Sequence, residues 1–449
     1  MALSSASFYR HRLVVVGGGF AGLNAVKSAA RLPVDITLVD RRNFHLFPPL
    51  LYQVASGGLS PGEIAAPLRA VMSRFQNVRV VMDTVTGFDV SGRRLLLAGG
   101  SIEYDTLVIA AGAENHYFGR DDWAAHAPGL KTIEDATLMR ARILLAFEEA
   151  ERESDPQIRR RWLRFAVVGG GPTGVELAGA VAEIARDTLR RDFRAIRPEE
   201  SEILLLEGGP RVLPSFPPKL SAAAERALIK IGVRTVTGVR VIDIDREGVP
   251  IESDESGTRA IEARTVLWAA GVRASRLGLV LGQAAGIEPD RMGRLSVGPD
   301  LSLAGHPEIM VLGDMALCEQ NGKPLPGVSP VAMQHGFHSA RVVAARLGGL
   351  PAPAFHYRDK GTMATIGRAA AVVDLGFVRF SGLAAWLTWL FVHLLYLVGY
   401  RSRLLVAIHW AFQYATFNRG ARLITGRDTV EPADKSGPDT IGRPANRQS

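Results

Sequence analysis

Two glycine-rich turns contain the residues of this chain that are best suited to bind a cofactor. The sequence GGGFAG occupies residues 17–22 and GGGPTG occupies residues 169–174, and both fit the spacing G-x-G-x-x-G. In this motif the first glycine allows a tight turn, the second lets the backbone approach a pyrophosphate, and the third lets a helix pack against the preceding strand. The expected contacts are Gly17, Gly19, Phe20, Ala21 and Gly22 in the first turn and Gly169, Gly171 and Gly174 in the second.

Each turn follows a run of hydrophobic residues and precedes a helical pattern, as the motif requires. Two such units in one chain indicate two bound dinucleotides. The usual reason for binding two is to pass a hydride from a nicotinamide to a flavin. The sequence therefore predicts an α/β protein with two Rossmann-like dinucleotide-binding domains.

An acidic residue ends the second strand of each unit. Asp40 lies about twenty residues beyond the first turn, where a carboxylate can accept hydrogen bonds from the ribose hydroxyls of an adenosine. A solvated aspartate at a strand end is the alternative, and the adjacent Arg41 is a further candidate contact. Glu207 ends residues 202–207 and would repel a 2′-phosphate, which favours NADH over NADPH. Arg211 lies close to Glu207 in sequence, so NADPH remains an alternative nucleotide.

Two further strands end in small residues, at 106–112 and 265–271, and this weak internal similarity supports two related folding units. A third strand ends in Gly-Asp, where Asp314 could accept a hydrogen bond from a flavin ribityl hydroxyl. Gly-Asp alone is common, but here it follows two nucleotide units. The additional candidate cofactor contacts are Ala111, Gly112, Ala270, Gly271, Asp314 and Ala332.

Composition narrows the possible classes of function. The chain has 449 residues, enough for two or three domains, and a formal net charge of +8. No dense Lys/Arg run is interleaved with aromatic residues, so we expect no nucleic-acid partner and favour an anionic membrane surface. The single cysteine, Cys318, excludes flavoenzymes that relay electrons through a cysteine pair, and it is expected to be a small buried side chain. No metal site is predicted.

Residues 380–400 contain no Asp, Glu, Lys or Arg and are long enough to cross a bilayer, whereas the uncharged stretch 404–417 is too short. Amphipathic side chains recur in the first stretch every three or four residues and so share one helix face. We expect a helix lying in one leaflet with these side chains at the headgroup level, and a membrane span or a helix buried at a dimer interface are the alternatives. Removing the chain from Phe380 onward should release the protein from membranes. The shared face comprises Trp386, Trp389, His393, Tyr396 and Tyr400, and the arginines expected at an anionic surface are Arg401, Arg403, Arg419 and Arg422.

The combination of motifs resembles the type II NADH dehydrogenases, which are single-subunit NADH:quinone oxidoreductases. The resemblance runs from about residue 12 to residue 423. It rests on NFHLF at 43–47, GGGPTGVELAG at 169–179, VLGD at 311–314, and a C-terminal end with GTMATIGR at 361–368 and RGARL at 419–423. The glycine turns occur in many flavoproteins, whereas the C-terminal end is far more discriminating.

The resemblance implies FAD in the N-terminal unit, NADH in the second unit, and three residues at the reaction site. Glu176 matches a glutamate near flavin and nicotinamide, although the helix dipole alone could favour an acid there. Family members often carry Ala-Gln-x-Ala-x-Gln at the quinone pocket. Here Gln334 matches the second glutamine, but Pro330 replaces the first, which puts the quinone type in doubt. Lys360 resembles a lysine at the pocket entrance or is a surface charge.

We therefore expect a peripheral membrane enzyme that transfers a hydride from NADH to FAD and two electrons onward to a membrane quinone. The expected location is the cytoplasmic face of the cell membrane, because no signal peptide precedes the first strand. We also expect a homodimer. Proton pumping is not expected, because the chain offers at most one span and no relay of intramembrane ionisable groups. A soluble NADH-dependent flavin reductase with a protein or oxygen acceptor, and a non-catalytic nucleotide-sensing flavoprotein, are the alternatives.

These expectations divide the chain into five parts. Residues 1–125 and 281–350 form the two parts of the FAD-binding domain, and residues 126–280 form the NADH-binding domain, entered through a charged helical stretch at about 134–160. Residues 351–427 form an amphipathic helical membrane-binding region, and residues 428–449 form a disordered tail.

Overall fold

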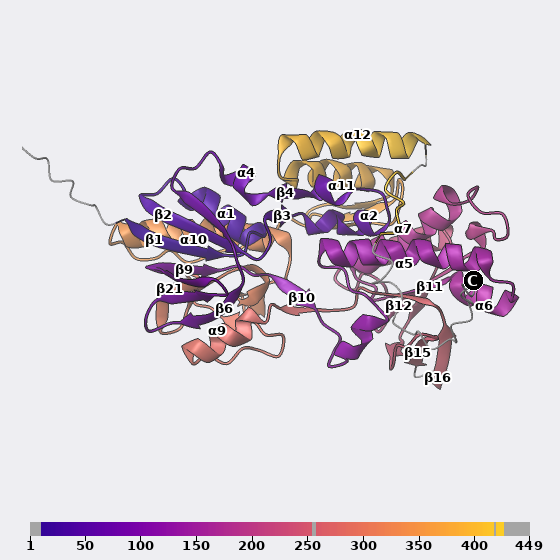
Figure 1. Cartoon of the computed structure of the whole chain (residues 1–449), viewed down its shortest axis with the longest axis horizontal. Coiled ribbons are helices and arrows are strands. Elements are labelled where there is room, and N and C mark those ends of the chain that lie inside the picture. The colour runs from indigo at the N-terminus through magenta and orange to yellow at the C-terminus, as the bar shows by residue number, and fades with distance from the viewer. Residues whose placement is uncertain (1–9, 254–256, 417–418, 426–449) are drawn as a thin grey trace, which may run out of the picture.

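A computed structural model describes residues 10–253, 257–416 and 419–425, so the expected tail at 428–449 lies outside the described residues. Two α/β units lie side by side, and a helical pair covers the upper side of the second unit (Figure 1). The predicted α/β fold with two dinucleotide-binding units is confirmed. Its parallel strands are near-continuous Val, Ile and Leu runs, as expected of sheets covered on both faces.

The first unit is built on a six-stranded sheet of order β20-β21-β9-β1-β2-β5. Its strands come from two distant stretches of the chain, because β21 pairs in parallel with β9, as in Ile309 beside Leu107. The strands are β1 (His11–Val16), β2 (Val34–Asp40), β5 (Val78–Met82), β9 (Thr106–Ile109), β20 (Ser302–Leu303) and β21 (His306–Val311).

Helices α1 (Phe20–Ala29) and α10 (Ser329–Leu347) cover one face of this sheet and pack closely against each other. A Cβ at Gly336 would lie 2.2 Å from the carbonyl oxygen of Ala21, so only glycine permits this approach of the two helices. The other face is covered by α9 (Leu277–Ala285) and by a small antiparallel sheet of β6 (Val85–Asp89), β7 (Arg94–Leu97) and β8 (Gly100–Glu103).

The second unit has a four-stranded parallel sheet of order β13-β12-β11-β17, with α5 (Ile133–Arg152), α7 (Pro172–Glu183) and α8 (Pro218–Lys230) beside it. The charged helical stretch predicted at 134–160 is helical and comprises two helices. Asp155 caps a second helix, α6 (Pro156–Trp162), and Pro156 cannot continue α5. The strands are β11 (Arg164–Val168), β12 (Glu202–Glu207), β13 (Val233–Thr237) and β17 (Thr265–Trp268), and a three-stranded sheet adds β14 (Arg240–Val241), β15 (Gly248–Ser253) and β16 (Gly257–Glu262).

Two short antiparallel strands carry the chain between the units. They are β10 (Ala113–Asn115) and β18 (Val272–Ala274), and each directly follows one of the small-residue strand ends predicted to line a cofactor. Arg273 on β18 forms an ion pair with Glu114 on β10 at 2.9 Å. The crossing therefore fixes the two strand ends relative to each other.

The C-terminal region begins with β25 (Thr362–Thr365), β26 (Ala371–Asp374) and β27 (Arg379–Ser381) and continues into α11 (Leu383–Tyr396) and α12 (Tyr400–Thr416). The apolar stretch 380–400 is therefore divided, because the backbone is extended at Leu397 and Gly399 adopts a positive φ of 91°. Among the described residues, none of the helices combines the length and apolar character needed to cross a membrane.

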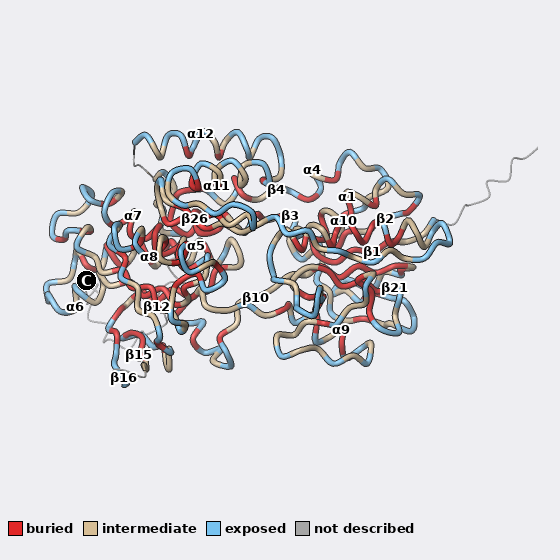
Figure 2. The backbone as a smooth tube through the Cα atoms, turned by 180° about the vertical axis from the view of Figure 1, so that it is seen from behind, coloured by how far each residue is buried: buried red, intermediate tan, exposed pale blue. Residues whose placement is uncertain are grey.

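The orientation predicted for the aromatic face at 386–400 is wrong for its two tryptophans, whereas Tyr396 and Tyr400 are 41% and 80% exposed. Trp386 and Trp389 are 8% and 1% exposed and belong to the core cluster of the second unit. On the opposite side, Leu387, Phe391 and Leu395 are 50–63% exposed. Figure 2 shows buried and exposed stretches alternating along α11. Trp389 packs against the rings of His393 and Trp410, with centroids 4.1 and 5.6 Å away.

Two of the arginines predicted to face an anionic surface instead make ion pairs within the protein. Arg419 contacts Glu183 at the end of α7 at 2.6 Å, and Arg422 contacts Asp192. The cause is the path of the C-terminal segment, which returns across the second unit after α12.

Candidate active site

The first glycine turn connects β1 to α1 and leaves an open approach to its backbone. Gly17 has a φ of +99°, and a Cβ there would lie 2.4 Å from the carbonyl oxygen of Ala110. A Cβ at Gly22 would lie 1.8 Å from the carbonyl oxygen of Gly17. A Cβ at Gly19, in contrast, would meet nothing within 4 Å. This is the shape that a pyrophosphate-binding turn needs.

Asp40 at the end of β2 closes the same turn from the side. Its carboxylate accepts hydrogen bonds from the backbone N–H of Gly18 at 2.6 Å and of Arg42 at 2.7 Å. These bonds fix both oxygens beside the turn while leaving lone pairs for a ribose. Arg41 is exposed next to it. His45 donates from Nδ1 to the carbonyl oxygen of Gly18 at 2.8 Å, and its buried Nε2 has no partner among the described residues.

The second turn, between β11 and α7, reproduces this geometry. Gly169 has a φ of +109°, a Cβ at Gly174 would lie 1.8 Å from the carbonyl oxygen of Gly169, and a Cβ at Gly171 would meet nothing within 4 Å. Glu207 accepts hydrogen bonds from the N–H of Gly170 at 2.6 Å and of Gly209 at 2.7 Å. The two units therefore carry equivalent cradles of backbone N–H groups.

Arg211, which left NADPH open, is engaged elsewhere. Its guanidinium donates to the carbonyl oxygens of Leu213, Pro214 and Phe216, the shortest bond being 2.7 Å to Phe216. The arginine thus holds the loop after β12 in shape and is not directed at the ribose side of Glu207.

The small-residue strand ends meet at the crossing between the units. Ser275 donates its N–H to the carbonyl oxygen of Gly112 at 3.0 Å, and His116 donates to that of Gly271 at 3.1 Å. Ala111 and Ala270 immediately precede these glycines. A Cβ at Gly169 would lie 2.6 Å from the Cα of Ala270, so the second cradle is in direct contact with this crossing.

Asp314 lies in a short 3-10 helix (Gly313–Met315) after β21. A Cβ at Gly313 would lie 3.4 Å from the Cβ of Ala332 and 3.6 Å from that of Ala21, so α1, α10 and this turn converge. Burial raises the pKa of Asp314, and the cation of Lys131 opposes that rise. Lys131 was not identified from the sequence, because its proximity to Asp314 arises only from tertiary folding.

Glu176 sits on α7, one turn into the helix, and its pKa is raised to about 8 because the surrounding protein desolvates the carboxylate. Its Oε1 accepts a hydrogen bond from the backbone N–H of Thr365 on β25 at 3.3 Å, which partly opposes the rise. Thr365 is another contact that sequence motifs did not reveal. Glu176 therefore holds its proton at neutral pH.

Lys360 belongs to the segment that leads to Glu176, and Gln334 on α10 contacts that segment. Both ends of the Gln334 amide bond the backbone of Arg358, with Nε2 donating to its carbonyl oxygen at 2.9 Å and Oε1 accepting from its N–H at 3.0 Å. The chain then passes Lys360, whose side chain is exposed, and reaches Thr365. Residues 358–365 thus connect α10 to α7, and the three residues assigned to the reaction site contact or belong to this bridge.

Aromatic side chains connect the first glycine turn to the C-terminal helices. Phe20 packs edge-on against Phe47, with ring centroids 5.6 Å apart, and Phe47 packs against His393 at 6.2 Å. His393 stacks on Trp389 at 4.1 Å, and Trp389 lies 5.6 Å from Trp410 on α12. An apolar wall therefore runs from the first cradle to α12.

Comparison with known proteins places this geometry in a family. Residues 11–336 match the family model "Pyridine nucleotide-disulphide oxidoreductase", and residues 360–419 match "NDH2 C-terminal domain". The chain is 45% identical over 423 residues to the type II NADH:quinone oxidoreductase Ndh of Mycobacterium tuberculosis, covering 93% of this chain and 90% of that protein. It belongs to the type II NADH:quinone oxidoreductase family.

Other comparisons agree with membership of the type II NADH:quinone oxidoreductases. The second M. tuberculosis protein of this kind, NdhA, is 44% identical over 93% of this chain and 90% of its own length. The structure of NDH2 from Plasmodium falciparum in complex with NADH superposes with a TM-score of 0.83 over 90% of this chain and 98% of that one, and at 20% identity this likeness concerns the fold alone. The resemblance recognised in the sequence is confirmed. The two alternatives, a soluble flavin reductase and a non-catalytic nucleotide sensor, are not supported.

Proposed function

We propose that this chain oxidises NADH and reduces a membrane quinone, with FAD held by the first cradle and NADH by the second. The observation that carries the proposal is the pair of equivalent glycine cradles on either side of the β10–β18 crossing, in a chain 45% identical to a type II NADH:quinone oxidoreductase. The family membership supports the enzyme as a whole, and the geometry supports the assignment of residues.

The first unit fits FAD on three counts. The turn at Gly17–Gly22 tolerates no side chain at its first or last glycine and is open at Gly19. Asp40 presents oxygens to a ribose, and the buried Nε2 of His45 beside the turn has no partner among the described residues. Asp314, Ala21 and Ala332 lie where α1 meets α10. The bound flavin supplies the hydride-accepting ring and passes on an electron pair.

Glu176 supplies a proton in this proposal. Hydride transfer from NADH delivers two electrons and one proton, whereas reduction of a quinone to a quinol consumes two electrons and two protons. The second proton comes from the Glu176 carboxyl, which then recovers one from solvent. A donor with a pKa of about 8 is protonated at neutral pH and still acidic enough to donate.

We assign the quinone side to the bridge at residues 358–365. Gln334 fixes the bridge at Arg358, and Lys360 places a cation on its exposed side. Pro330 stands where the resemblance expects a glutamine, so one hydrogen-bond donor to the quinone head group is absent from the described site. The aromatic wall from Phe47 to Trp410 offers apolar surface for the quinone tail.

The decisive experiment is anaerobic reduction of the purified protein by NADH, followed by reoxidation with ubiquinone and menaquinone analogues in parallel. Flavin absorbance should bleach with NADH and return with at least one quinone. Protein that purifies colourless and takes up no FAD, or bleached protein that no quinone reoxidises, would contradict the proposal.

We further propose a peripheral location on the cytoplasmic face of the cell membrane, with an anionic surface as partner and a homodimer as the assembly. The exposed apolar side of α11 and α12, with Phe391 at 63% and Ile408 at 55%, supports contact with lipid. The homodimer is testable by light scattering in detergent.

Replacing three exposed side chains of α11, as Leu387→Ser, Phe391→Ser and Leu395→Ser together, should weaken binding to phosphatidylcholine vesicles by at least about 30-fold, since each loses apolar area that lipid would cover. Turnover of a water-soluble quinone should persist. Cosedimentation measures the binding.

Deleting the chain from Phe380 is a poorer test, because it also removes the buried Trp386 and Trp389. Leu279→Ser, at a side chain 56% exposed on α9, is the control. Equal vesicle binding by all proteins would refute the lipid-facing assignment.

Replacing Glu207 with glutamine should raise the ratio of kcat/KM for NADPH to that for NADH by about 10- to 100-fold. The neutral amide removes the repulsion of a 2′-phosphate but keeps the shape of the strand end. Steady-state kinetics with both nucleotides measures the ratio. Glu225→Gln on α8, hydrogen-bonded to Thr235, removes the same charge away from the cradle and should leave the ratio unchanged. An unchanged ratio in the Glu207 variant would show that another group selects the nucleotide.

A further inference from the structure

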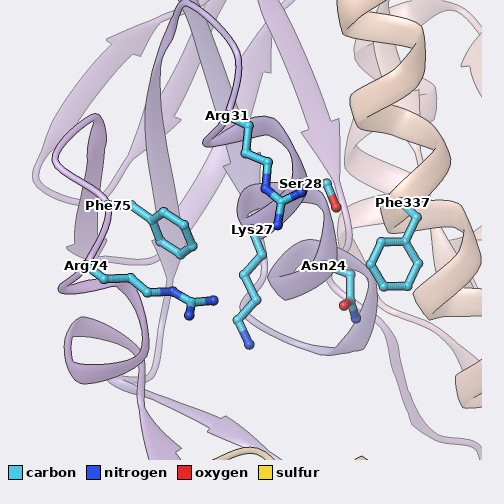
Figure 3. Close-up of a pocket in the computed structure, with 7 residues that line it drawn as sticks. All are labelled: Asn24, Lys27, Ser28, Arg31, Arg74, Phe75 and Phe337. Atoms are coloured by element: carbon cyan, nitrogen blue, oxygen red, sulfur yellow. The ribbon is translucent and has the colours of Figure 1, made fainter.

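A pocket of about 580 Å³ opens between α1, α10 and the turn that follows α4 (Leu68–Met72), outside the candidate active site. Three cations line it: Lys27 and Arg31 from α1, and Arg74 from the turn after α4. Figure 3 shows the Arg74 side chain extending toward Lys27, with the Arg31 guanidinium nearby. Three positive groups therefore surround one cavity.

No carboxylate lines this pocket, and among the described residues none of its three cations forms an ion pair. Burial and the neighbouring charges of Arg74 and Arg403 lower the pKa of Lys27, and no carboxylate opposes that shift. Another pocket, beside α6 in the second unit, differs because Glu200 and Glu202 line it together with its arginines. The pocket on α1 therefore has an unbalanced positive charge that a bound anion would stabilise.

The remaining walls are polar and aromatic. Asn24 and Ser28 come from α1, and two rings flank the opening: Phe75, and Phe337 on α10, which is 48% exposed. A ligand with a phosphate and an apolar part would satisfy both kinds of wall. A bare inorganic anion would leave the rings uncovered.

The pocket lies beside the apolar surface of the C-terminal helices. Val398, in the link between α11 and α12, packs against the same core cluster as Phe75. Arg403 in the first turn of α12 is close enough to act on the charge of Lys27. At this end of α12, Tyr400 is 80% exposed and Leu404 is 48% exposed. In Figures 1 and 2, α4 and α12 both lie along the upper side of the molecule.

We propose that this pocket binds the phosphate of an anionic phospholipid headgroup while the α11–α12 surface rests on the bilayer. The inference depends on the membrane contact proposed above and adds a specific site to it. Lys27, Arg31 and Arg74 contact the phosphate, and Phe75 and Phe337 contact the glycerol and the upper part of the chains. The site distinguishes anionic from zwitterionic lipid, because a choline group would bring a positive charge to three cations.

The test compares full-length proteins on vesicles of phosphatidylcholine alone and of phosphatidylcholine with phosphatidylglycerol at about 30%. Wild type should prefer the anionic vesicles. The double variant Lys27→Gln/Arg74→Gln should have a preference about 30-fold smaller, because each lost charge reduces the binding constant for anionic vesicles about fivefold. Binding to phosphatidylcholine alone should be equal in both. The control removes two arginines from the far unit, Arg160→Gln on α6 and Arg259→Gln on β16, and should keep the preference within about twofold.

Calorimetry with dihexanoyl phosphatidylglycerol and with inorganic phosphate separates the two sources of the anion. The short-chain lipid should bind saturably to wild type, weakly to the double variant and weakly to Arg31→Gln, and inorganic phosphate should bind at least about tenfold more weakly than the lipid. Equal affinity for both ligands would overturn the lipid assignment. A double variant with full preference for phosphatidylglycerol would overturn the site while leaving the membrane contact standing. Failure of wild type to bind either vesicle would refute both.

Discussion

Replacing Gly174 with alanine should yield a protein that is yellow with FAD but is reduced by NADH at least about 100-fold more slowly. The new Cβ would lie 1.8 Å from the carbonyl oxygen of Gly169, so the second turn must open and the nicotinamide loses its alignment. Stopped-flow bleaching of the flavin by NADH measures the rate. The absorbance of the purified protein measures FAD content.

The equivalent change in the first turn provides the matched comparison. Gly22→Ala places a Cβ 1.8 Å from the carbonyl oxygen of Gly17 and should give colourless protein. Gly62→Ala, where a Cβ meets nothing within 4 Å, should behave as wild type. If Gly174→Ala lost FAD while Gly22→Ala kept it, the two cradles would have to exchange their assigned cofactors.

Replacing Glu176 with glutamine should lower kcat/KM for quinone about 100-fold, the usual contribution of a positioned acid. Wild-type turnover should fall as the pH rises through about 8, because the carboxyl then has no proton to give. The variant should lack that alkaline limb. Steady-state profiles from pH 6 to pH 10 measure both. Bleaching by NADH in a single turnover should change far less than reoxidation by quinone.

The pH dependence of the free energy of unfolding provides an independent test of the raised pKa of Glu176. The pKa of Glu176 is raised in the folded protein from 4.5 to about 8, so folding favours the protonated carboxyl. The free energy of unfolding should therefore decrease in wild type as the pH rises from about 5 to about 8, by at most 1.36 kcal/mol per unit, and more gently in Glu176→Gln. The exposed Glu200→Gln serves as control. A glutamine variant with full quinone turnover and an unchanged alkaline limb would remove Glu176 from the reaction.

The fold could be predicted because local rules determine it. Each glycine turn carries its own signal, since a Cβ at Gly22 or Gly174 would clash with the carbonyl oxygen of the glycine five residues earlier in the same turn. Cys318 is buried, as its type suggested. Predicting these features requires only the hydrophobic pattern of the strands and the steric limits of the turns.

Features that depend on contacts distant in sequence could not be read in the same way. The spacing of Trp386 and Trp389 correctly placed them on one face, but helical periodicity does not say whether an aromatic face meets lipid or protein. Lys131 beside Asp314 and Thr365 beside Glu176 arise where separate elements converge. The inward turn of Arg419 likewise depends on Glu183, which lies on α7.

The buried position of Trp389 has a consequence for cleavage of the chain. Trp389, Trp410 and Val406 share one core cluster with Phe165 and Val167 of β11. If a protease removed the chain after β27, the interior of the nucleotide-binding unit would therefore lose apolar contacts. The product would not be an intact dehydrogenase. The surface that we propose meets lipid cannot be shed by limited proteolysis without exposing that interior to water.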